Sequence, residues 1–209
     1  MTEITQGTPE WHAQRLGKVT ASRVADVIAK TKTGYSTSRE NYMAQLICER
    51  LTGTPTEGFT NAAMQWGTET EPKAREAYEA TTFTSVREVA MIFHPSIPNT
   101  GASPDGLIGE DGLIEIKCPN TATHLDTLLS QKVPGKYVTQ MQWQMACTGR
   151  QWCDFVSFDP RLPEHLQLFV KRVSRDNDFI KQTEDEIVAF LLELEQKIES
   201  LNKLDKSNG

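Results

Sequence analysis

One short segment sets the architecture of this chain: residues 103–119 read SPDGLIGEDGLIEIKCP. Its two strand-like runs, an apolar one at 107–108 and one with alternating isoleucines at 113–117, flank the turn-forming residues 109–112, which comprise two glycines, a glutamate and an aspartate. Extended apolar runs on either side of a short glycine-containing turn are typical of a β-hairpin. The segment therefore predicts two antiparallel strands joined by a tight turn.

The strands of this hairpin would sort their side chains onto two faces. Side chains two residues apart in a strand point the same way, so Glu115 and Lys117 share one face. Ile114 and Ile116 occupy the opposite face, where they can anchor the strand in the core. Asp105 lies just after a proline, at the start of the partner strand, and the hairpin can bring it beside Glu115. The segment thus predicts two carboxylates and an amine close together.

An aspartate, a glutamate and a lysine on one sheet surface could hydrolyse a phosphodiester. Two carboxylates can hold Mg²⁺, a hard ion that prefers oxygen ligands and keeps several waters. The metal lowers the pKa of a bound water and stabilises the transition state, and a neighbouring lysine can orient that water. The spacing P-D-x(n)-E-x-K is that of the PD-(D/E)xK nucleases. The same short pattern also occurs in exposed hairpins that carry ordinary surface charges.

Length and composition favour one globular domain. The chain has 209 residues, of which 38% are hydrophobic, enough for a substantial core. We predict a single domain over residues 1–202 and a polar tail at 203–209. No apolar run reaches the ~18 residues of a membrane helix, and the N-terminal residues lack the pattern of a secretory signal. We therefore expect a cytoplasmic protein without a membrane partner.

The charge balance and the cysteines narrow the possible functions. The formal net charge is −6, whereas a passive DNA-binding module is usually basic because contacts to phosphates supply most of its affinity. An acidic chain argues against a simple DNA binder, but not against a metal-dependent nuclease that needs carboxylates. The cysteines match no zinc-binding spacing and are expected to be small buried hydrophobes. They are Cys48, Cys118, Cys147 and Cys153.

Hydrophobic periodicity and breaking residues place the remaining elements. A helix of about three turns is expected after Thr20, whose side chain would cap it. A helical region at 61–80 should be interrupted at Gly67 and Pro72. The other expected elements are a polar loop at 31–38, helices at 39–51, 136–148 and 176–202, and strands at 89–93, 152–158 and 166–173. This order predicts an α/β (α+β) domain with helices around a central sheet.

Ordered motifs along the chain resemble the phage lambda exonuclease family, the YqaJ-type viral recombinases, within the PD-(D/E)xK nuclease superfamily. They follow the order of that family across residues 9–162. The matching stretches are Trp11-His12, Arg15-Leu16-Gly17, Thr20-Ala21-Ser22, Trp66-Gly67 leading to Glu71, Ser103-Pro104-Asp105-Gly106-Leu107, Glu115-Ile116-Lys117-Cys118-Pro119, Tyr137-Val138-Thr139-Gln140 and Asp159-Pro160-Arg161. The hairpin lies among them, so the resemblance includes the residues that would carry the chemistry.

The resemblance implies a fold, an activity and an assembly. The fold would be a restriction-endonuclease-like central mixed sheet flanked by helices. The activity would be magnesium-dependent 5′→3′ digestion of the 5′-ended strand of linear double-stranded DNA to mononucleotides. It would use two Mg²⁺ per site, with Mn²⁺ as a substitute, and would leave 3′ single-stranded tails for recombination by strand annealing. The assembly would be a ring-shaped homotrimer at double-stranded DNA ends, working with a single-strand annealing protein.

The resemblance also assigns roles to individual residues. Asp105, Glu115, Glu71 and the main-chain carbonyl of Ile116 would bind metal, and Lys117 would position the attacking water. A pocket for the 5′-terminal phosphate would consist of Arg15, Ser22, Ser103 and Gln140. Met64 would be an apolar wedge at the end base pair, and Lys32 would belong to a basic loop along the duplex.

Four of these residues also have a plainer interpretation, and two other functions remain open. Glu71 could be a solvated helix glutamate, Ser22 a helix cap, Met64 a core residue and Lys32 an exposed lysine. An endonuclease of the same superfamily is one alternative function. A non-catalytic scaffold for DNA ends is another, although a scaffold has no need of a filled set of catalytic positions.

Overall fold

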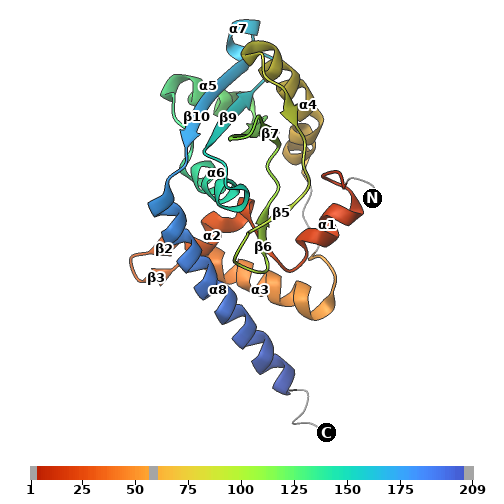
Figure 1. Ribbon diagram of the computed structural model, residues 1–209, viewed down its shortest axis with the longest axis vertical. Coiled ribbons are helices and arrows are strands. Elements are labelled where there is room, and N and C mark those ends of the chain that lie inside the picture. The colour runs from red at the N-terminus through yellow and green to blue at the C-terminus, as the bar shows by residue number, and fades with distance from the viewer. Residues whose placement is uncertain (1–3, 57–60, 205–209) are drawn as a thin grey trace.

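The computed structural model describes residues 4–56 and 61–204 and is built around a five-stranded sheet (Figure 1). The sheet has the order β10-β9-β8-β7-β4. Strands β8 and β9 are parallel, and the other neighbouring pairs are antiparallel. Their bounds are β4 Val86–Arg87, β7 Gly106–Ile108, β8 Gly112–Lys117, β9 Trp152–Phe158 and β10 Leu168–Ser174. This is the mixed central sheet that was expected.

The predicted hairpin is the pair β7–β8. Leu107 lies opposite Leu113, and Gly106 lies opposite Ile114. A Cβ atom on Gly106 would lie 2.1 Å from the side chain of Val86 in the next strand, so only glycine fits directly after Asp105. The close approach of β4 therefore explains the Asp-Gly pair at the start of the hairpin.

The other strands of the described residues form two smaller sheets. One has the order β1-β6-β5, with bounds Val19–Thr20, Thr100–Ala102 and Ile92–Phe93. The other pairs β2, Lys30–Thr31, with β3, Gly34–Tyr35. The prediction of a polar loop at 31–38 was therefore wrong in part, because a short hairpin and the start of a helix lie there. The strand expected over 89–93 is confined to its last two residues.

Helices lie on both sides of the five-stranded sheet (Figure 1). Their bounds are α1 Pro9–Arg15, the 3₁₀ turn η1 Ala21–Arg23, α2 Val24–Ile28, α3 Thr37–Thr52, α4 Ala62–Thr82, α5 Thr121–Ser130, α6 Gly135–Thr148, α7 Glu164–Gln167 and α8 Asn177–Leu204. The predicted helices at 39–51, 136–148 and 176–202 are confirmed. Gly53 and Gly149 end two of them in the left-handed conformation. The strand expected to start at 166 begins at Leu168, because α7 precedes it.

The helix expected after Thr20 is shorter than predicted. It consists of η1 and the five-residue α2, and the side chain of Thr20 caps neither. Thr20 is instead the last residue of β1, where it lies opposite Gly101, and its N–H donates to the Tyr42 hydroxyl over 3.2 Å. Thr20 thus pairs in a strand, whereas the sequence alone had predicted it to cap a helix.

Helix α4 runs without interruption through Gly67 and Pro72, so the predicted break was wrong. A proline inside a helix removes one hydrogen bond, which tertiary packing can offset. Ala74 and Tyr78 supply that packing, because they lie fully buried against Ile114 and Ile116 of β8. The two isoleucines therefore anchor β8 on the α4 side, as expected, and leave Glu115 and Lys117 facing the other way.

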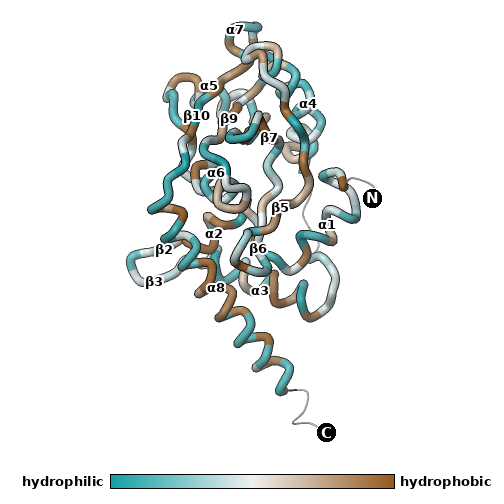
Figure 2. Tube along the Cα trace, in the orientation of Figure 1, coloured by the Kyte–Doolittle hydropathy of each residue, from teal (hydrophilic) through white to brown (hydrophobic). Residues whose placement is uncertain are grey.

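The larger core lies on the opposite side, among α2, α3, α6 and α8. Its largest buried side chains include Tyr42, Trp143 and Phe190. Apolar residues recur along α8 between hydrophilic ones (Figure 2), and the stripe from Ile187 to Leu194 is buried in this core. Within the described residues, no helix has both the length and the apolar character needed to cross a membrane.

Two smaller predictions have mixed outcomes. Cys118, Cys147 and Cys153 are buried, whereas Cys48 is exposed, so the expectation of a buried thiol was wrong for Cys48. Helix α8 includes residues 203 and 204, which were assigned to the polar tail, and the rest of that tail, 205–209, lies outside the described residues. The assignment of residues 1–202 to one domain stays a prediction.

Candidate active site

Glu115 lies at the centre of the candidate site and is completely shielded from solvent. One of its carboxylate oxygens, Oε1, accepts a hydrogen bond from Gln140 over 2.7 Å and pairs with the Lys117 ammonium at 2.5 Å. The other, Oε2, accepts a hydrogen bond from Gln144 over 2.6 Å. Strand β8 and helix α6 thus hold one buried carboxylate between them. These three partners offset the free-energy cost of burying a charged carboxylate.

Asp105 reaches the same strand from the end of the hairpin. Its Oδ2 accepts a hydrogen bond from the backbone N–H of Ile116 over 2.6 Å. Burial raises the pKa of Asp105 well above its usual range, and the nearby carboxylates of Glu115 and Glu71 raise it further. The expectation that the hairpin brings Asp105 beside Glu115 is confirmed. The result is a cluster of like charges that a bound cation would stabilise.

The Lys117 side chain stays protonated although it is largely buried near Glu115 and Asp105. Burial by itself lowers the pKa of its ammonium, but the carboxylates of Glu115 and Asp105 outweigh burial and raise the pKa above its usual value. The ammonium also lies 5.0 Å from the centre of the Tyr137 ring. A lysine held in the protonated form cannot remove a proton, so it is suited to orienting a water and offsetting negative charge.

Glu71 approaches the cluster from helix α4. Burial raises its pKa, Arg75 opposes that change, and Glu115 raises it again. One oxygen of Glu71 is 2.7 Å from the Arg75 guanidinium, which also contacts Glu88 at 2.7 Å. The charges of Glu115 and Lys117 both act on the pKa of Glu71, so Glu71 lies close to the site. Its Oε1 is engaged by Arg75, which leaves the second carboxylate oxygen, Oε2, as the one that could bind a metal.

The donor set fits a magnesium ion held partly by substrate. No group of three or more Asp, Glu, His or Cys side chains in the described parts of the chain is arranged to enclose an ion by itself. Mg²⁺ commonly takes only one or two carboxylates, with water and phosphate oxygens completing its octahedron. Asp105 and Glu115, together with the main-chain carbonyl of Ile116 that follows Glu115 in β8, could supply such an incomplete set of hard oxygen ligands.

Arg15 and Ser103, two of the four residues assigned to a phosphate pocket, are in contact. The Arg15 guanidinium donates to Ser103 Oγ over 3.3 Å, and Trp11 Nε1 donates to the same oxygen over 3.0 Å. The guanidinium also stacks 4.2 Å from the centre of the Trp11 ring. Burial lowers the pKa of Arg15, and among the described residues no carboxylate forms an ion pair with it. A half-buried arginine without a counter-ion is suited to an anionic ligand.

Ser22 and Gln140, the other two, have other hydrogen-bond partners in this structure. Ser22 is exposed, and its Oγ lies 3.4 Å from Thr20 Oγ1. It lies within η1 rather than at the start of a long helix, so neither the helix-cap interpretation nor a strong helix dipole applies. Gln140 donates to Glu115. The structure therefore brings together Arg15 and Ser103, and it places Gln140 at the carboxylate of Glu115.

The two residues assigned to duplex contacts lie at the surface. Met64 is in the first turn of α4 and is 55% exposed, so its interpretation as a core residue was wrong. Lys32 is exposed in the turn between β2 and β3. An exposed methionine in the first turn of the helix that bears Glu71 is compatible with the wedge assignment. That assignment stays a prediction, as does the role of Lys32.

Sequence reasoning missed Gln144 and Arg75. Gln144 follows Gln140 by one helical turn, so both amides project from one face of α6. Arg75 follows Glu71 at the same spacing in α4. The spacing of four residues was a usable signal in both cases, but only the tertiary structure shows which carboxylates these side chains meet.

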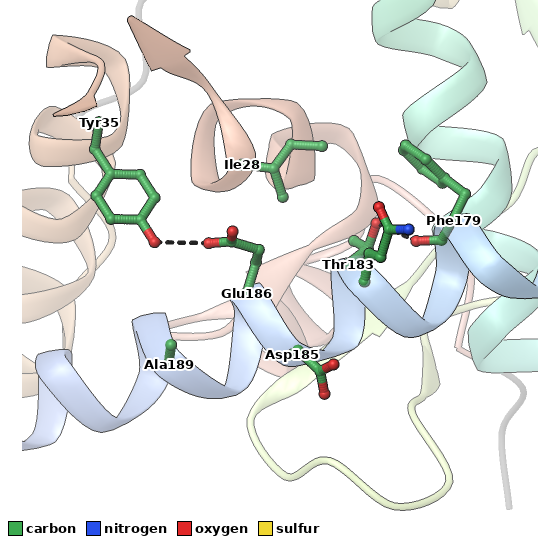
Figure 3. Close-up of a pocket in the computed structure, with 8 residues that line it drawn as sticks. Ile28, Tyr35, Phe179, Thr183, Asp185, Glu186 and Ala189 are labelled. Carbon is green, nitrogen blue, oxygen red and sulfur yellow. Dashed lines mark hydrogen bonds between the residues drawn. The ribbon is translucent and has the colours of Figure 1, made fainter. Parts of the chain in front are cut away.

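A separate pocket lies between α2, β3 and α8 (Figure 3). Its lining includes Tyr35, whose hydroxyl donates to Glu186 over 2.7 Å, together with Ile28 and Phe179. None of the residues assigned to metal or phosphate lines it. Glu186 is already paired with Tyr35 and Lys30, so the pocket presents little unsatisfied charge and is not part of the candidate active site.

Residues 10–151 match the model of the YqaJ-like viral recombinase domain. The chain belongs to this family. The matched range includes the hairpin, the carboxylates and α6, so the site just described lies within the family's domain. The predicted resemblance is confirmed. No curated protein matches the chain significantly.

Solved structures support the same relationship. The chain is 56% identical to an alkaline exonuclease, LHK-Exo, from Laribacter hongkongensis, with a TM-score of 0.91, over 97% of this chain and 100% of that one. LHK-Exo has also been solved in complex with dAMP. A phage-related exonuclease from Haemophilus somnus 129PT is 17% identical, with a TM-score of 0.73 over 88% of this chain and 96% of that one, and shows the shared fold. The YqaJ-family member described here is an enzyme of the nuclease class.

Proposed function

We propose that this nuclease is a magnesium-dependent 5′→3′ exonuclease. It digests the 5′-ended strand of linear double-stranded DNA to mononucleotides and leaves 3′ single-stranded tails. The observation that carries the proposal is the buried cluster of Asp105, Glu115 and Lys117 at the end of β8. The 56% identity to an alkaline exonuclease supports exonuclease activity, and the dAMP complex of that relative supports a mononucleotide product.

The residues of the cluster take distinct parts in the proposed reaction. Asp105, Glu115 and the Ile116 carbonyl would hold Mg²⁺, or Mn²⁺ in its place, and Glu71 would serve a second ion. When bound, the metal lowers the pKa of a water and neutralises charge on the scissile phosphate. Lys117, charged because of its two carboxylate neighbours, orients that water by a hydrogen bond. Oxygen ligands and one fixed cation thus converge where the phosphodiester would lie.

The contact between Arg15 and Ser103 supports the proposed direction of digestion. Ser103 lies two residues before Asp105, so a phosphate held by Arg15 and Ser103 would lie next to the metal site. A terminal 5′ phosphate seated there would place the adjacent phosphodiester at the metals. Ser22 and Gln140 would complete the pocket once DNA draws Gln140 away from Glu115. Met64 and Lys32 would contact the duplex outside it.

Removal of the 5′ phosphate from a linear duplex should slow its digestion. A charge-assisted hydrogen bond contributes about 1.5–3 kcal/mol, so Arg15→Ala should lower kcat/KM on 5′-phosphorylated ends by about 10- to 100-fold. The same variant should lower the rate on 5′-hydroxyl ends much less. The measurement is release of label from both kinds of end, by wild type and variant. Equal rates on the two ends with the wild-type enzyme would contradict the phosphate pocket.

The assembly and partners are part of the proposal. A homotrimeric ring around the duplex would retain the substrate of an acidic protein by topology, since the net charge of −6 does not favour DNA. A single-strand annealing protein would coat the 3′ tail in the cytoplasm. A molecular mass of three chains in solution would support the ring, and that of one chain would oppose it.

Digestion of a linear duplex labelled at one 5′ end tests reaction, polarity and cofactor together. We expect labelled mononucleotide early in the reaction, only when Mg²⁺ or Mn²⁺ is present. A covalently closed duplex should remain intact. Cleavage of the closed duplex would favour the endonuclease alternative. Absence of cleavage together with absence of metal binding would favour the scaffold alternative.

A further inference from the structure

Two glutamine amides from one helix hold the carboxylate of Glu115. Gln140 donates to Oε1 over 2.7 Å and Gln144 donates to Oε2 over 2.6 Å. The two glutamines are four residues apart in α6, so they project from the same face of that helix. Each oxygen of the carboxylate is therefore fixed by its own donor, which sets the rotation of the carboxylate plane.

Gln144 differs from Gln140 in its access to ligands. Gln144 has no exposed surface, whereas Gln140 is half-buried. The amide oxygen of Gln144 accepts a weak hydrogen bond from the buried thiol of Cys153, whose sulfur is 3.9 Å away. This contact points the Gln144 nitrogen towards Glu115. Gln144 cannot reach DNA, so any effect on the reaction must pass through Glu115.

Counting lone pairs shows what this arrangement leaves available. A carboxylate offers about two acceptor positions on each oxygen. The Oε1 atom uses its positions for Gln140 and Lys117, whereas among the described residues Oε2 accepts only from Gln144. The remaining position on Oε2 is the one open to a cation. Without Gln144, Oε2 would have no protein donor, and the carboxylate could rotate away from that orientation.

We propose that Gln144 is a positioning residue that orients Glu115 for metal binding. The inference rests on the proposed function, because it assumes that Glu115 is a metal ligand. Groups that fix a ligating side chain typically contribute about 10- to 100-fold to metal affinity. The role belongs to Gln144 rather than Gln140, because a buried amide without access to DNA has no competing partner.

The test is Gln144→Met, which keeps a long unbranched side chain but removes the amide. The matched control is Gln142→Met, from the same helix. Gln142 is also buried, but its amide binds the Ser174 carbonyl and the Asp176 N–H, away from the cluster. Free Mn²⁺ is measured by electron paramagnetic resonance during titration of wild type and both variants, without DNA. Asp105→Asn identifies the part of the binding that belongs to this site.

We expect Gln144→Met to raise the Kd for Mn²⁺ at the site by about 10-fold or more. Gln142→Met should lower thermal stability but leave this Kd within about twofold. A folded Gln144→Met variant with wild-type affinity would overturn the inference, and so would an equal loss of affinity in both variants. If the wild-type enzyme itself does not bind Mn²⁺ at the site, the proposed function fails first.

A second measurement needs no variant and covers the case in which Gln144→Met does not fold. The side-chain amide of Gln144 in the wild-type enzyme is followed by ¹⁵N nuclear magnetic resonance during addition of Mg²⁺. Its resonances should shift as the metal binds Glu115, because the hydrogen bond to Oε2 changes strength. The side-chain amide resonances of Gln142 should not shift. A Gln144 amide that ignores Mg²⁺ while the metal binds would contradict the positioning role.

Discussion

Lys117→Ala is expected to lower the cleavage rate by about a thousandfold while the enzyme still binds DNA. Removal of one fixed donor from a transition-state site typically costs about 10²–10³ in kcat. Here the loss should reach the upper end, because Lys117 also pairs with Glu115. Its removal leaves that buried carboxylate with only its two amide donors. The measurement is single-turnover digestion of a linear duplex at saturating enzyme and Mg²⁺.

Lys136→Ala is the matched control for this change. The ammonium of Lys136 lies 4.8 Å from the centre of the Tyr137 ring, compared with 5.0 Å for Lys117, so both lysines contact the same aromatic side chain. Lys136 is exposed and has no carboxylate partner among the described ion pairs. Its alanine variant should digest DNA at close to the wild-type rate. Wild-type cleavage by Lys117→Ala would falsify the assignment of this lysine.

The hairpin at the centre of the site could be predicted because its information is local. The turn residues and the alternation of the strand determine which side chains share a face, and Ile114 and Ile116 are buried on the α4 side as that alternation requires. The direction of Gln140 could not be predicted in this way. Its amide can turn to Glu115 or to a phosphate, and the packing of α6 against β8 decides between them.

Two helices show why local signals are incomplete. Pro72 suggested a break, yet the burial of Ala74 and Tyr78 keeps α4 continuous, and continuity is what places Glu71 near Glu115. Helix α5 was missed, although the side chain of Asn120 caps it by accepting the N–H of Thr123 over 2.9 Å. Leu125 and Leu129 of α5 are exposed. The residues that α5 buries are His124 and Thr127, so no apolar periodicity in the sequence marks its inner face.

Asp105→Asn is expected to abolish activity and, without metal, to stabilise the protein. The pKa of Asp105 is raised in the folded state, by burial first and then by Glu115 and Glu71. An acid with a raised folded-state pKa binds its proton more tightly in the folded than in the unfolded chain. Stability therefore falls as the pH rises from the usual pKa of aspartate to the raised value, and the whole penalty is present above it.

Asparagine removes this penalty and keeps the acceptor for the Ile116 N–H. At alkaline pH without metal, the Asp105→Asn variant should therefore have a higher Tm than the wild type. A gain of about 1 kcal/mol moves Tm by about 2–4 °C in a domain of this size, which calorimetry resolves. At low pH, where Asp105 is protonated in both states, the difference should vanish.

Added Mg²⁺ should reverse this difference, so that the wild type has a higher Tm than Asp105→Asn. A ligand that binds only the folded state raises its stability, so the Tm of the wild type should increase with Mg²⁺ concentration. The variant lacks one of the carboxylates and should respond little, while its cleavage rate falls on the order of a thousandfold or more. Asp111→Asn, an exposed aspartate in the turn of the same hairpin, should respond to Mg²⁺ as the wild type does.

A reversal by Mg²⁺ of which protein has the higher Tm would distinguish a metal site from a cluster that only stabilises the fold. If Asp105 only stabilised the fold through the Ile116 N–H, its replacement would lower the Tm or leave it unchanged at every pH, and Mg²⁺ would act equally on both proteins. If the cluster is a cation site, the like charges of Asp105, Glu115 and Glu71 destabilise the empty protein and stabilise the occupied one. The order of the two Tm values with and without Mg²⁺ distinguishes these cases without any measurement of activity.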